Sequence, residues 1–172
     1  MYNQKGKVWK CPFQSKLRNR CSDTSQSTHT DLKILQWNAR RLSQNKKTEL
    51  HLKLAKNDVD IFTIMEANLM AEKLIYYQLS GYIHYSLPKY RQVASGILIA
   101  VSNSLCAEFK IVKEMGNWEH KSETVKVNVW KKGNNFTIYV IYSPPNNKLD
   151  FTSLYVTSKT IMIGDFNVYS PK

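Results

Sequence analysis

Polar side chains follow four apolar runs of this sequence, each at the point where the run ends. Asn38 follows LQW, Glu66 follows FTIM, Tyr142 lies in VIYSPP, and GDFN supplies Asp165 and Asn167. Residues just past buried strands often form active sites, because the sheet holds them rigidly while the loop leaves them accessible. We therefore expect these five side chains to meet at one edge of the sheets.

Together these residue types suit the hydrolysis of a phosphodiester. The carboxylate of Glu66 can bind a hard cation, and that of Asp165 can orient or deprotonate a water molecule. Amide and phenol donors can stabilise the charge that develops on phosphoryl oxygens. Each residue alone has an ordinary explanation, because carboxylates cap strand ends, tyrosines pack and asparagines favour turns. The interpretation therefore depends on the whole set.

The first part of the sequence predicts two strand–helix pairs. The expected elements are a strand at 32–37, a helix at 43–58 with Ser43 as its N-cap, a strand at 59–66, and a helix at 68–82 that ends at Gly81. Leu50 and Leu54 would lie on the buried face of the first helix.

The pattern changes to strands after the second helix. YIHYS, SGILIAVSN and CAEFKIV follow in order, and residues 124–130 alternate so that their valines face one side. KKGNN predicts a hairpin turn into 136–143, which is apolar on both faces and should be central. A helix or turn at about 147–156 leads to the strand TIMI, which Gly164 should end. The predicted fold class is α/β, a mixed-sheet sandwich with helices outside.

Length and composition indicate one globular domain. The 172 residues allow a core of their own, and the hydrophobic fraction of 42% argues against disorder. The longest apolar runs, 97–101 and 138–142, are too short to cross a bilayer, and the N-terminus lacks the apolar core of a secretory signal. We expect no membrane partner and no small-molecule cofactor, and the sequence does not predict an oligomeric state.

The formal charge of +12 predicts weak electrostatic binding to DNA. Residues 1–31 hold six basic and two acidic residues, so residues 32–172 carry most of the excess, +8. A surface this positive attracts nucleic acid, because binding releases the counterions condensed on it. A well-solvated surface explains the charge equally well.

Residues 1–31 read as a flexible basic and polar extension, and residues 32–172 as the folded part. Cys11, Cys21 and Cys106 are scattered, which argues against a disulfide framework and for a reducing compartment. A zinc site built from Cys11, Cys21 and His29 lacks the short ligand spacing that such sites use.

Five motifs, taken in order, resemble the endonuclease/exonuclease/phosphatase domain. They are QWNARRL, IFTIMEANL, SGILIAV, VIYSPP and IMIGDFN, and the resemblance covers residues 32–170. More narrowly, the chain is similar to the apurinic-type endonuclease that opens the polyprotein of non-LTR retrotransposons of the jockey-like group. The resemblance implies a DNase I-like sandwich and a nuclease that uses Mg²⁺ or Mn²⁺. The parent enzyme would nick DNA to leave a 3′-hydroxyl that primes reverse transcription.

The resemblance also implies roles for the five residues. Asn38 and Glu66 would belong to the metal site, with Glu66 as the direct ligand. Tyr142 would contact the scissile phosphate, Asp165 would activate the water, and Asn167 would help to hold the phosphate.

The sequence departs from the family pattern after GDFN. That motif is commonly followed by Ala-His and later by Trp-Gly, whereas here VYSPK follows and Tyr169 stands where the histidine is expected. Relatives of the apurinic endonucleases often carry Asn at the place of Pro145, although many retrotransposon members also have Pro. The family has a further Asp and an Asp-His pair beyond GDFN, and all four histidines of this chain precede Tyr142. We therefore expect a C-terminally truncated domain that holds its metal weakly and is inactive alone.

Three alternatives stay open on the sequence. One is a non-catalytic, basic module that binds nucleic acid, and another is a phosphatase-type member of the same superfamily. The third is a decayed remnant of a mobile element with no selected function. If the chain is expressed, we expect it inside the cell and in the nucleus.

Overall fold

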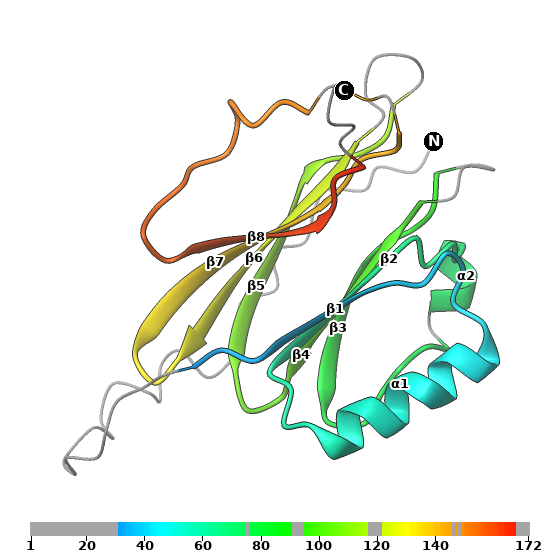
Figure 1. The fold of residues 1–172 in the computed structure, drawn as a ribbon. Helices are drawn as coiled ribbons and strands as arrows, with labels where there is room; N and C mark the ends of the chain where they lie inside the picture. Colours follow the sequence, from blue (N-terminus) through cyan, green and yellow to red (C-terminus); the bar gives the residue numbers. More distant parts are fainter. Residues whose placement is uncertain are drawn as a thin grey trace, which may run out of the picture.

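The computed structural model describes residues 31–74, 76–90, 95–116, 122–145, 147 and 149–167. Figure 1 shows two sheets packed face to face, with helices on the outer side of one sheet. The first sheet has the strand order β1-β2-β4-β3 and the second β5-β6-β7-β8. The predicted mixed-sheet α/β sandwich is confirmed. The extension proposed for residues 1–31, including Cys11, Cys21 and His29, lies almost entirely outside the described residues.

The elements follow the chain in a simple order. The first sheet and its helices are β1 (Ile34–Asn38), α1 (Gln44–Lys56), β2 (Ile61–Met65), α2 (Ala71–Leu74), β3 (Tyr82–Leu87) and β4 (Ile97–Ser102). The second sheet is β5 (Cys106–Lys113), β6 (Glu123–Lys131), β7 (Asn134–Tyr142) and β8 (Thr160–Asp165). Strands β1 and β2 are parallel, as are β7 and β8, and the other neighbouring pairs are antiparallel.

Strand β2 is buried on both faces, because one face meets the second sheet and the other meets the helix layer. Ile61 and Met65 pack with the inward valines of β6 between the sheets. Phe62 and Ile64 pack on the other face with Leu50 of α1. This explains why residues 61–65 are uniformly apolar or small rather than alternating.

Helix α1 and the β6–β7 hairpin form where the sequence predicts them. The Ser43 hydroxyl accepts a hydrogen bond from the Lys46 amide and so caps the helix. The hairpin turns at Lys132 and Gly133, which have φ angles of 46° and 77°. Two successive positive φ values match the twist of the flanking strands. Strand β7 lies inside its sheet, as its two apolar faces indicate.

The helix predicted at 68–82 is wrong for most of its length. Helix α2 covers only Ala71–Leu74, and the following segment is held by contacts to other elements. The Tyr77 phenol donates to the Leu42 carbonyl at 3.1 Å, and the Leu79 amide donates to His84 Nε2 at 3.1 Å. Tertiary hydrogen bonds therefore override the local helical pattern. The helix or turn predicted at 147–156 contains only turns among its described residues.

Gly164 does not end the last strand, contrary to the prediction. Strand β8 continues through it to Asp165. Gly164 has a φ of 155°, and a Cβ atom built on it would run into the backbone of Ile141 on β7. Glycine is therefore needed here for close approach of two strands, and not for a break.

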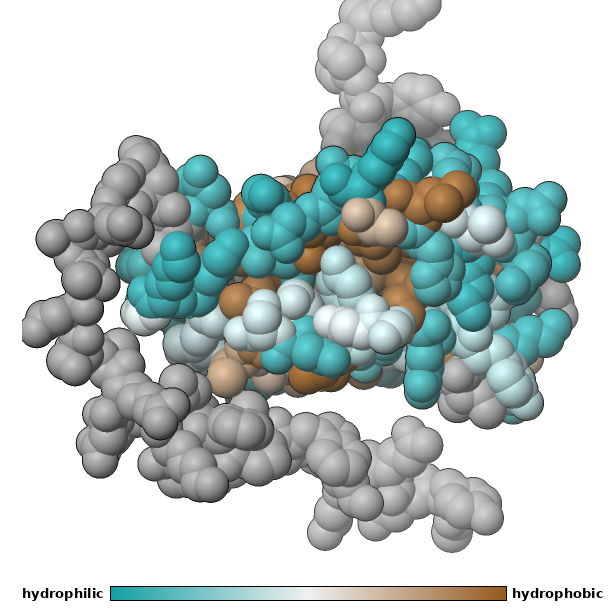
Figure 2. Space-filling view, turned by 90° about the horizontal axis from the view of Figure 1, so that it is seen from below, coloured by the Kyte–Doolittle hydropathy of each residue, from teal (hydrophilic) through white to brown (hydrophobic). Residues whose placement is uncertain are grey.

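The surface is mainly hydrophilic, with hydrophobic area in the middle of the view from below (Figure 2). Several large apolar side chains remain exposed on the described residues: Leu52, Met70, Tyr76, Ile83, Ile111, Phe151, Tyr155 and Val156. No helix in the described part of the chain is long and apolar enough to span a membrane.

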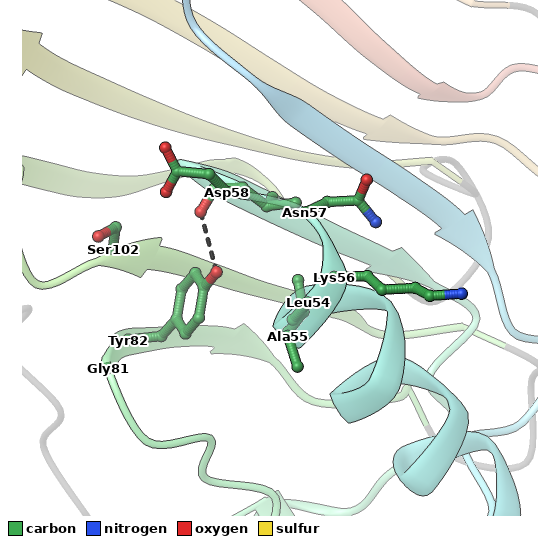
Figure 3. Close-up of a pocket in the computed structure, with 9 residues that line it drawn as sticks. Leu54, Ala55, Lys56, Asn57, Asp58, Gly81, Tyr82 and Ser102 are labelled. Carbon is green, nitrogen blue, oxygen red and sulfur yellow. Dashed lines mark hydrogen bonds between the residues drawn. The ribbon is translucent and has the colours of Figure 1, made fainter.

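A hollow of about 500 Å³ lies where α1 ends, beside the start of β3. In Figure 3 the Tyr82 phenol points to this corner, and its hydroxyl donates to the Val59 carbonyl at 2.9 Å. The hollow adjoins the beginning of β2, at the opposite end of that strand from Glu66. It is therefore separate from the candidate site.

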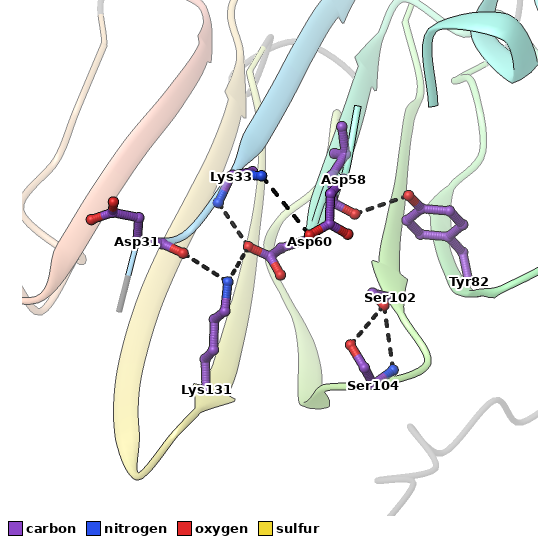
Figure 4. A network of polar contacts seen from close by, with 9 residues as sticks. Asp31, Lys33, Asp58, Asp60, Tyr82, Ser102, Ser104 and Lys131 are labelled. Carbon is purple, nitrogen blue, oxygen red and sulfur yellow. Dashed lines mark hydrogen bonds and ion pairs between the residues drawn. The ribbon is translucent and has the colours of Figure 1, made fainter. Parts of the chain in front are cut away.

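An ion pair ties the two sheets together at that same end. Lys131 Nζ lies 2.6 Å from Asp60 Oδ2, which also accepts a hydrogen bond from the Lys33 amide (Figure 4). The two charged side chains are only 19% and 12% exposed, so water screens them little. Asp60 precedes β2 and Lys131 ends β6, so the pair joins the first sheet to the second.

Candidate active site

Two parallel strand pairs bring four of the predicted residues to one end of the sandwich. In the β1–β2 pair Asn38 lies opposite Met65, the residue before Glu66. In the β7–β8 pair Tyr142 lies opposite Asp165. Parallel neighbours end at the same edge of a sheet, so each pair places its polar residues together.

Strands β1 and β8 then join the two pairs across the sheets. The Gln36 side-chain amide donates to the Gly164 carbonyl at 3.1 Å. One step further along, Asn38 Nδ2 donates to Asp165 Oδ2 at 2.5 Å. The first and last described strands are therefore neighbours at the site.

The side-chain amide of Asn38 is bonded at both ends. Its nitrogen donates to Asp165, and its oxygen accepts from the Arg40 amide at 2.9 Å. An amide that is itself held by a second hydrogen bond is well placed to fix the carboxylate that it touches. In this structure Asn38 therefore orients Asp165.

Glu66 sits on a left-handed turn directly after β2. Its φ is 49°, and that of Asn68 is 54°. Such angles cost a non-glycine residue roughly 1–3 kcal/mol, and they persist where neighbouring contacts impose them. Here the Ala67 amide donates to the Gly96 carbonyl at 3.1 Å, and the Asn68 amide to the Ser95 carbonyl at 3.0 Å. The turn thus fixes the backbone that carries the half-buried Glu66 side chain.

Tyr142 is 3% exposed and meets Glu66 at the site. Burial raises the pKa of its phenol, and the charge and hydrogen bond of Glu66 raise the pKa further, with smaller effects of Glu123 and Asp165. The phenol is therefore protonated and is a hydrogen-bond donor at neutral pH. Its carboxylate neighbours place negative charge around the space where a cation would bind.

Asn167 closes the site from the segment after β8. Its φ is 41°, and its side-chain nitrogen donates to the Ser143 carbonyl at 2.8 Å. The Ser143 amide in turn donates to the Asp165 carbonyl at 2.9 Å. Residues 143 and 165–167 thus form one hydrogen-bonded corner next to Tyr142.

The donors present fit a hard cation with few protein ligands. Glu66 and Asp165 supply two carboxylates at one end of the fold, and oxygen donors of this kind suit Mg²⁺ or Mn²⁺. The described residues contain no group of three or more His, Cys, Asp or Glu side chains close enough to form a metal site. A cation here would take its remaining ligands from water and from a bound phosphate.

Of the described histidines, neither belongs to this set. His51 is exposed on α1, and His84 lies in β3 with its ring packed against Phe62. Burial lowers the pKa of His84, and the charge of Lys47 lowers it further, so the ring is neutral at physiological pH. His29, His120 and Tyr169 lie outside the described residues.

The sequence analysis missed Glu123, which is 1% exposed at the start of β6. It lies opposite Tyr142 in the β6–β7 register. A signal for it exists, because Glu123 has the same parity as the inward-facing Val125, Val127 and Val129. A carboxylate at an inward position of an alternating strand is uncommon and indicates a buried polar contact.

Comparison with solved structures decides the fold. TDP2 from D. rerio, complexed with single-strand DNA product, matches with a TM-score of 0.58 at 15% identity over 81% of this chain. The fold is DNase I-like. An endonuclease/exonuclease/phosphatase family protein from Leptotrichia buccalis C-1013-b gives 0.55 at 14% identity over 80%, and the catalytic domain of human Nocturnin, with bound sulfate, gives 0.52 at 14% over 80%. These likenesses show the DNase I-like fold and no more.

The chain spans about two thirds of each of these solved chains: 62% of D. rerio TDP2, 67% of the Leptotrichia protein and 64% of Nocturnin. No protein-family profile matches the sequence, and no curated protein does.

Proposed function

We propose that residues 32–172 belong to a metal-dependent endonuclease domain that cleaves phosphodiesters in DNA. One observation carries the proposal: Asn38, Glu66, Tyr142, Asp165 and Asn167, spread over the length of the folded part, meet at one end of a DNase I-like sandwich. A scaffold has no structural need for two carboxylates on a shared polar corner, and such clusters are typical of functional sites.

The arrangement assigns each side chain a task. A cation bound at Glu66 would neutralise charge on the phosphoryl oxygens. Asp165, held by Asn38, would accept the proton of the attacking water from a fixed direction. The protonated Tyr142 would donate to a phosphoryl oxygen in place of its present bond to Glu66. Asn167, anchored on Ser143, would hold the phosphate from the other side.

The charge of the chain supports DNA as the substrate. Residues 32–172 carry most of the formal +12. Arg40 and Arg41 lie two and three residues after Asn38 and are exposed, so positive charge lies close to the proposed site. Phosphate contacts of this kind give affinity without sequence preference.

The order of the five sequence motifs and the YSPP form of the fourth favour an endonuclease of the non-LTR retrotransposon type over a phosphatase. In that reading the parent protein nicks target DNA and primes reverse transcription from the new 3′-hydroxyl. The nucleus is then the place of action.

Binding of a metal ion tests the site directly. Tb³⁺, a hard cation that stands in for Mg²⁺, should bind weakly to the 172-residue chain, and its luminescence should rise on excitation of the tyrosines, because Tyr142 lies at the site. Glu66→Gln should weaken binding at least tenfold, whereas Glu49→Gln, on the exposed side of α1, should not change it. Binding that Glu66→Gln leaves intact would overturn the proposed site.

A plasmid-nicking assay tests the activity. We expect the chain by itself to nick supercoiled plasmid with Mg²⁺ or Mn²⁺ little above background, because general acid–base assistance is worth about 100- to 10,000-fold and the described residues supply no histidine for it. Strong nicking abolished by Glu66→Gln would show an active enzyme and refute inactivity. DNA binding with neither Tb³⁺ binding nor nicking would instead favour a non-catalytic nucleic-acid-binding module.

A further inference from the structure

Glu123 is a buried carboxylate for which the proposed mechanism has no task. It begins β6 in the second sheet, yet its side chain contacts the first sheet. Glu123 Oε2 accepts a hydrogen bond from the Gly96 amide at 3.0 Å, and the carboxylate is also hydrogen-bonded to the Ser95 side chain. Ser95 and Gly96 directly precede β4, next to β2. The contact therefore crosses from one sheet to the other at the end where the site lies.

The same two residues support the turn that carries Glu66. The carbonyls of Gly96 and Ser95 accept from the amides of Ala67 and Asn68, the residues just after Glu66. The amide of Gly96 and the hydroxyl of Ser95 are bonded to Glu123. Each member of this dipeptide thus has Glu123 on one side and the Glu66 turn on the other.

The dipeptide has little freedom of its own. Gly96 has a φ of 94°, and a Cβ there would lie 3.1 Å from the Lys89 amide nitrogen. The Ser95 hydroxyl accepts from the Tyr90 amide at 2.9 Å. A rigid intermediary transmits a displacement from one side to the other, because closely packed groups cannot absorb it.

Glu123 is also linked to the other side of the site. It lies directly opposite Tyr142 in the β6–β7 register, and the Tyr142 phenol is bonded to Glu66. The backbone of Glu123 is therefore paired with that of Tyr142, while its side chain is linked through Ser95 and Gly96 to the turn after Glu66.

We infer that Glu123 is a positioning residue, which fixes the distance between Glu66 and Tyr142 by clamping the Ser95–Gly96 backbone of the first sheet to β6 of the second. The inference deepens the proposed function, since it gives a reason why a carboxylate is kept in the core. It does not make Glu123 a metal ligand, because its known partners are the Gly96 amide and the Ser95 side chain.

Hydrogen exchange at single amides tests the clamp in the 172-residue chain without any metal. Glu123→Ala should speed exchange at Ala67 and Asn68 at least tenfold relative to the amides of β2. Glu123→Gln should restore slow exchange, because its side-chain oxygen can accept from Gly96 and its nitrogen can donate to Ser95. The matched control is Asp60→Asn, which weakens the polar tie between the same two sheets at their opposite end and should leave Ala67 and Asn68 unchanged relative to β2.

The result that would overturn the clamp is equal acceleration of Ala67, Asn68 and the β2 amides in Glu123→Ala, or the same pattern in Asp60→Asn. If Glu123→Ala does not fold, Ser95→Ala is the second variant, because it removes one partner of the carboxylate. It should speed exchange at Asn68 relative to the amides of β2. No acceleration at Asn68 in Ser95→Ala would likewise refute the clamp.

A Tb³⁺ titration of the same variants separates this inference from the proposed function. We expect Glu123→Ala to weaken binding about tenfold and Glu123→Gln to restore it. If the unaltered chain binds no Tb³⁺, the proposed metal site is wrong, and the exchange data still decide whether Glu123 holds the turn.

Discussion

Asn38 and Asp165 lie 127 positions apart in the chain, and the side-chain amide of Asn38 donates to the Asp165 carboxylate at 2.5 Å. One residue ends the first strand of the fold, and the other ends the last described strand. Their contact joins the two sheets at the proposed site and fixes the direction of the carboxylate assigned to water activation.

Asn38→Ala should lower the free energy of unfolding by about 1–3 kcal/mol, because a hydrogen bond to a charged group is lost and a half-buried carboxylate is left with fewer donors. Urea denaturation measures the change. Gln36→Ala is the control, since Gln36 is exposed and its side chain donates to the neutral Gly164 carbonyl of β8, and it should cost less than 1 kcal/mol. Equal losses of unfolding free energy in both variants would show that the bond to Asp165 stabilises the fold no more than the bond to the Gly164 carbonyl does.

Glu123 should make the chain less stable as the pH rises towards 7. Burial raises its pKa from 4.5 to about 7, and the charge of Glu114 adds to this, while the hydrogen bonds from Gly96 and Ser95 oppose it. The folded state therefore holds a proton that the unfolded state has lost. The free energy of unfolding then falls by on the order of 3 kcal/mol between about pH 4.5 and 7, and it is level above that range.

The comparison of Glu123→Gln with the unaltered chain isolates this effect. The variant is neutral at every pH, so the two proteins should be similar near pH 4.5, and the variant should be more stable at pH 8. Thermal unfolding across this range measures the difference. Glu72→Gln, an exposed change on α2, should show no such divergence, and a constant difference for Glu123→Gln would contradict the raised pKa.

DNA binding should depend steeply on salt and hardly on sequence. For about four phosphate contacts, the affinity falls on the order of a hundredfold between 50 and 200 mM salt. Replacing Arg40 and Arg41 by glutamine should weaken binding and reduce the slope by about two, because these exposed side chains stand at the site. The matched pair Lys53 and Lys56, in the last turn of α1, should have a smaller effect. Affinity that is indifferent to salt would refute electrostatic binding.

Gly164→Ala should be far more damaging than Gly81→Ala. Both glycines have positive φ, 155° and 86°, so alanine is strained at each. A side chain at Gly81 meets open space, whereas one at Gly164 collides with the Ile141 backbone on β7. We expect a loss of about 1–2 kcal/mol for Gly81→Ala and failure to fold for Gly164→Ala. Circular dichroism and solubility distinguish the two, and a folded, stable Gly164→Ala would show that β7 and β8 can separate there.

The sequence by itself determined the elements whose pattern is local. Ser43 predicts the start of α1, the turn residues Lys132 and Gly133 predict the hairpin, and the valines of β6 predict its buried face. Each signal depends on a few neighbouring residues, so no distant contact can easily override it. The five motifs also identified the fold class and the candidate residues, because their order is a property of the sequence alone.

Tertiary structure decided which of these residues touch and what each contact does. Residues 68–82 have a helical sequence pattern, yet α2 covers only Ala71–Leu74, and the Tyr77 and Tyr82 phenols donate to the distant Leu42 and Val59 carbonyls. The sequence predicts that Gly164 ends the last strand, whereas in the structure Gly164 lies within β8 and allows its close approach to Ile141. The bond from Asn38 to Asp165 likewise forms only when the two sheets are packed together. These outcomes depend on groups far apart in the chain, and their energies exist only once the two sheets are packed together.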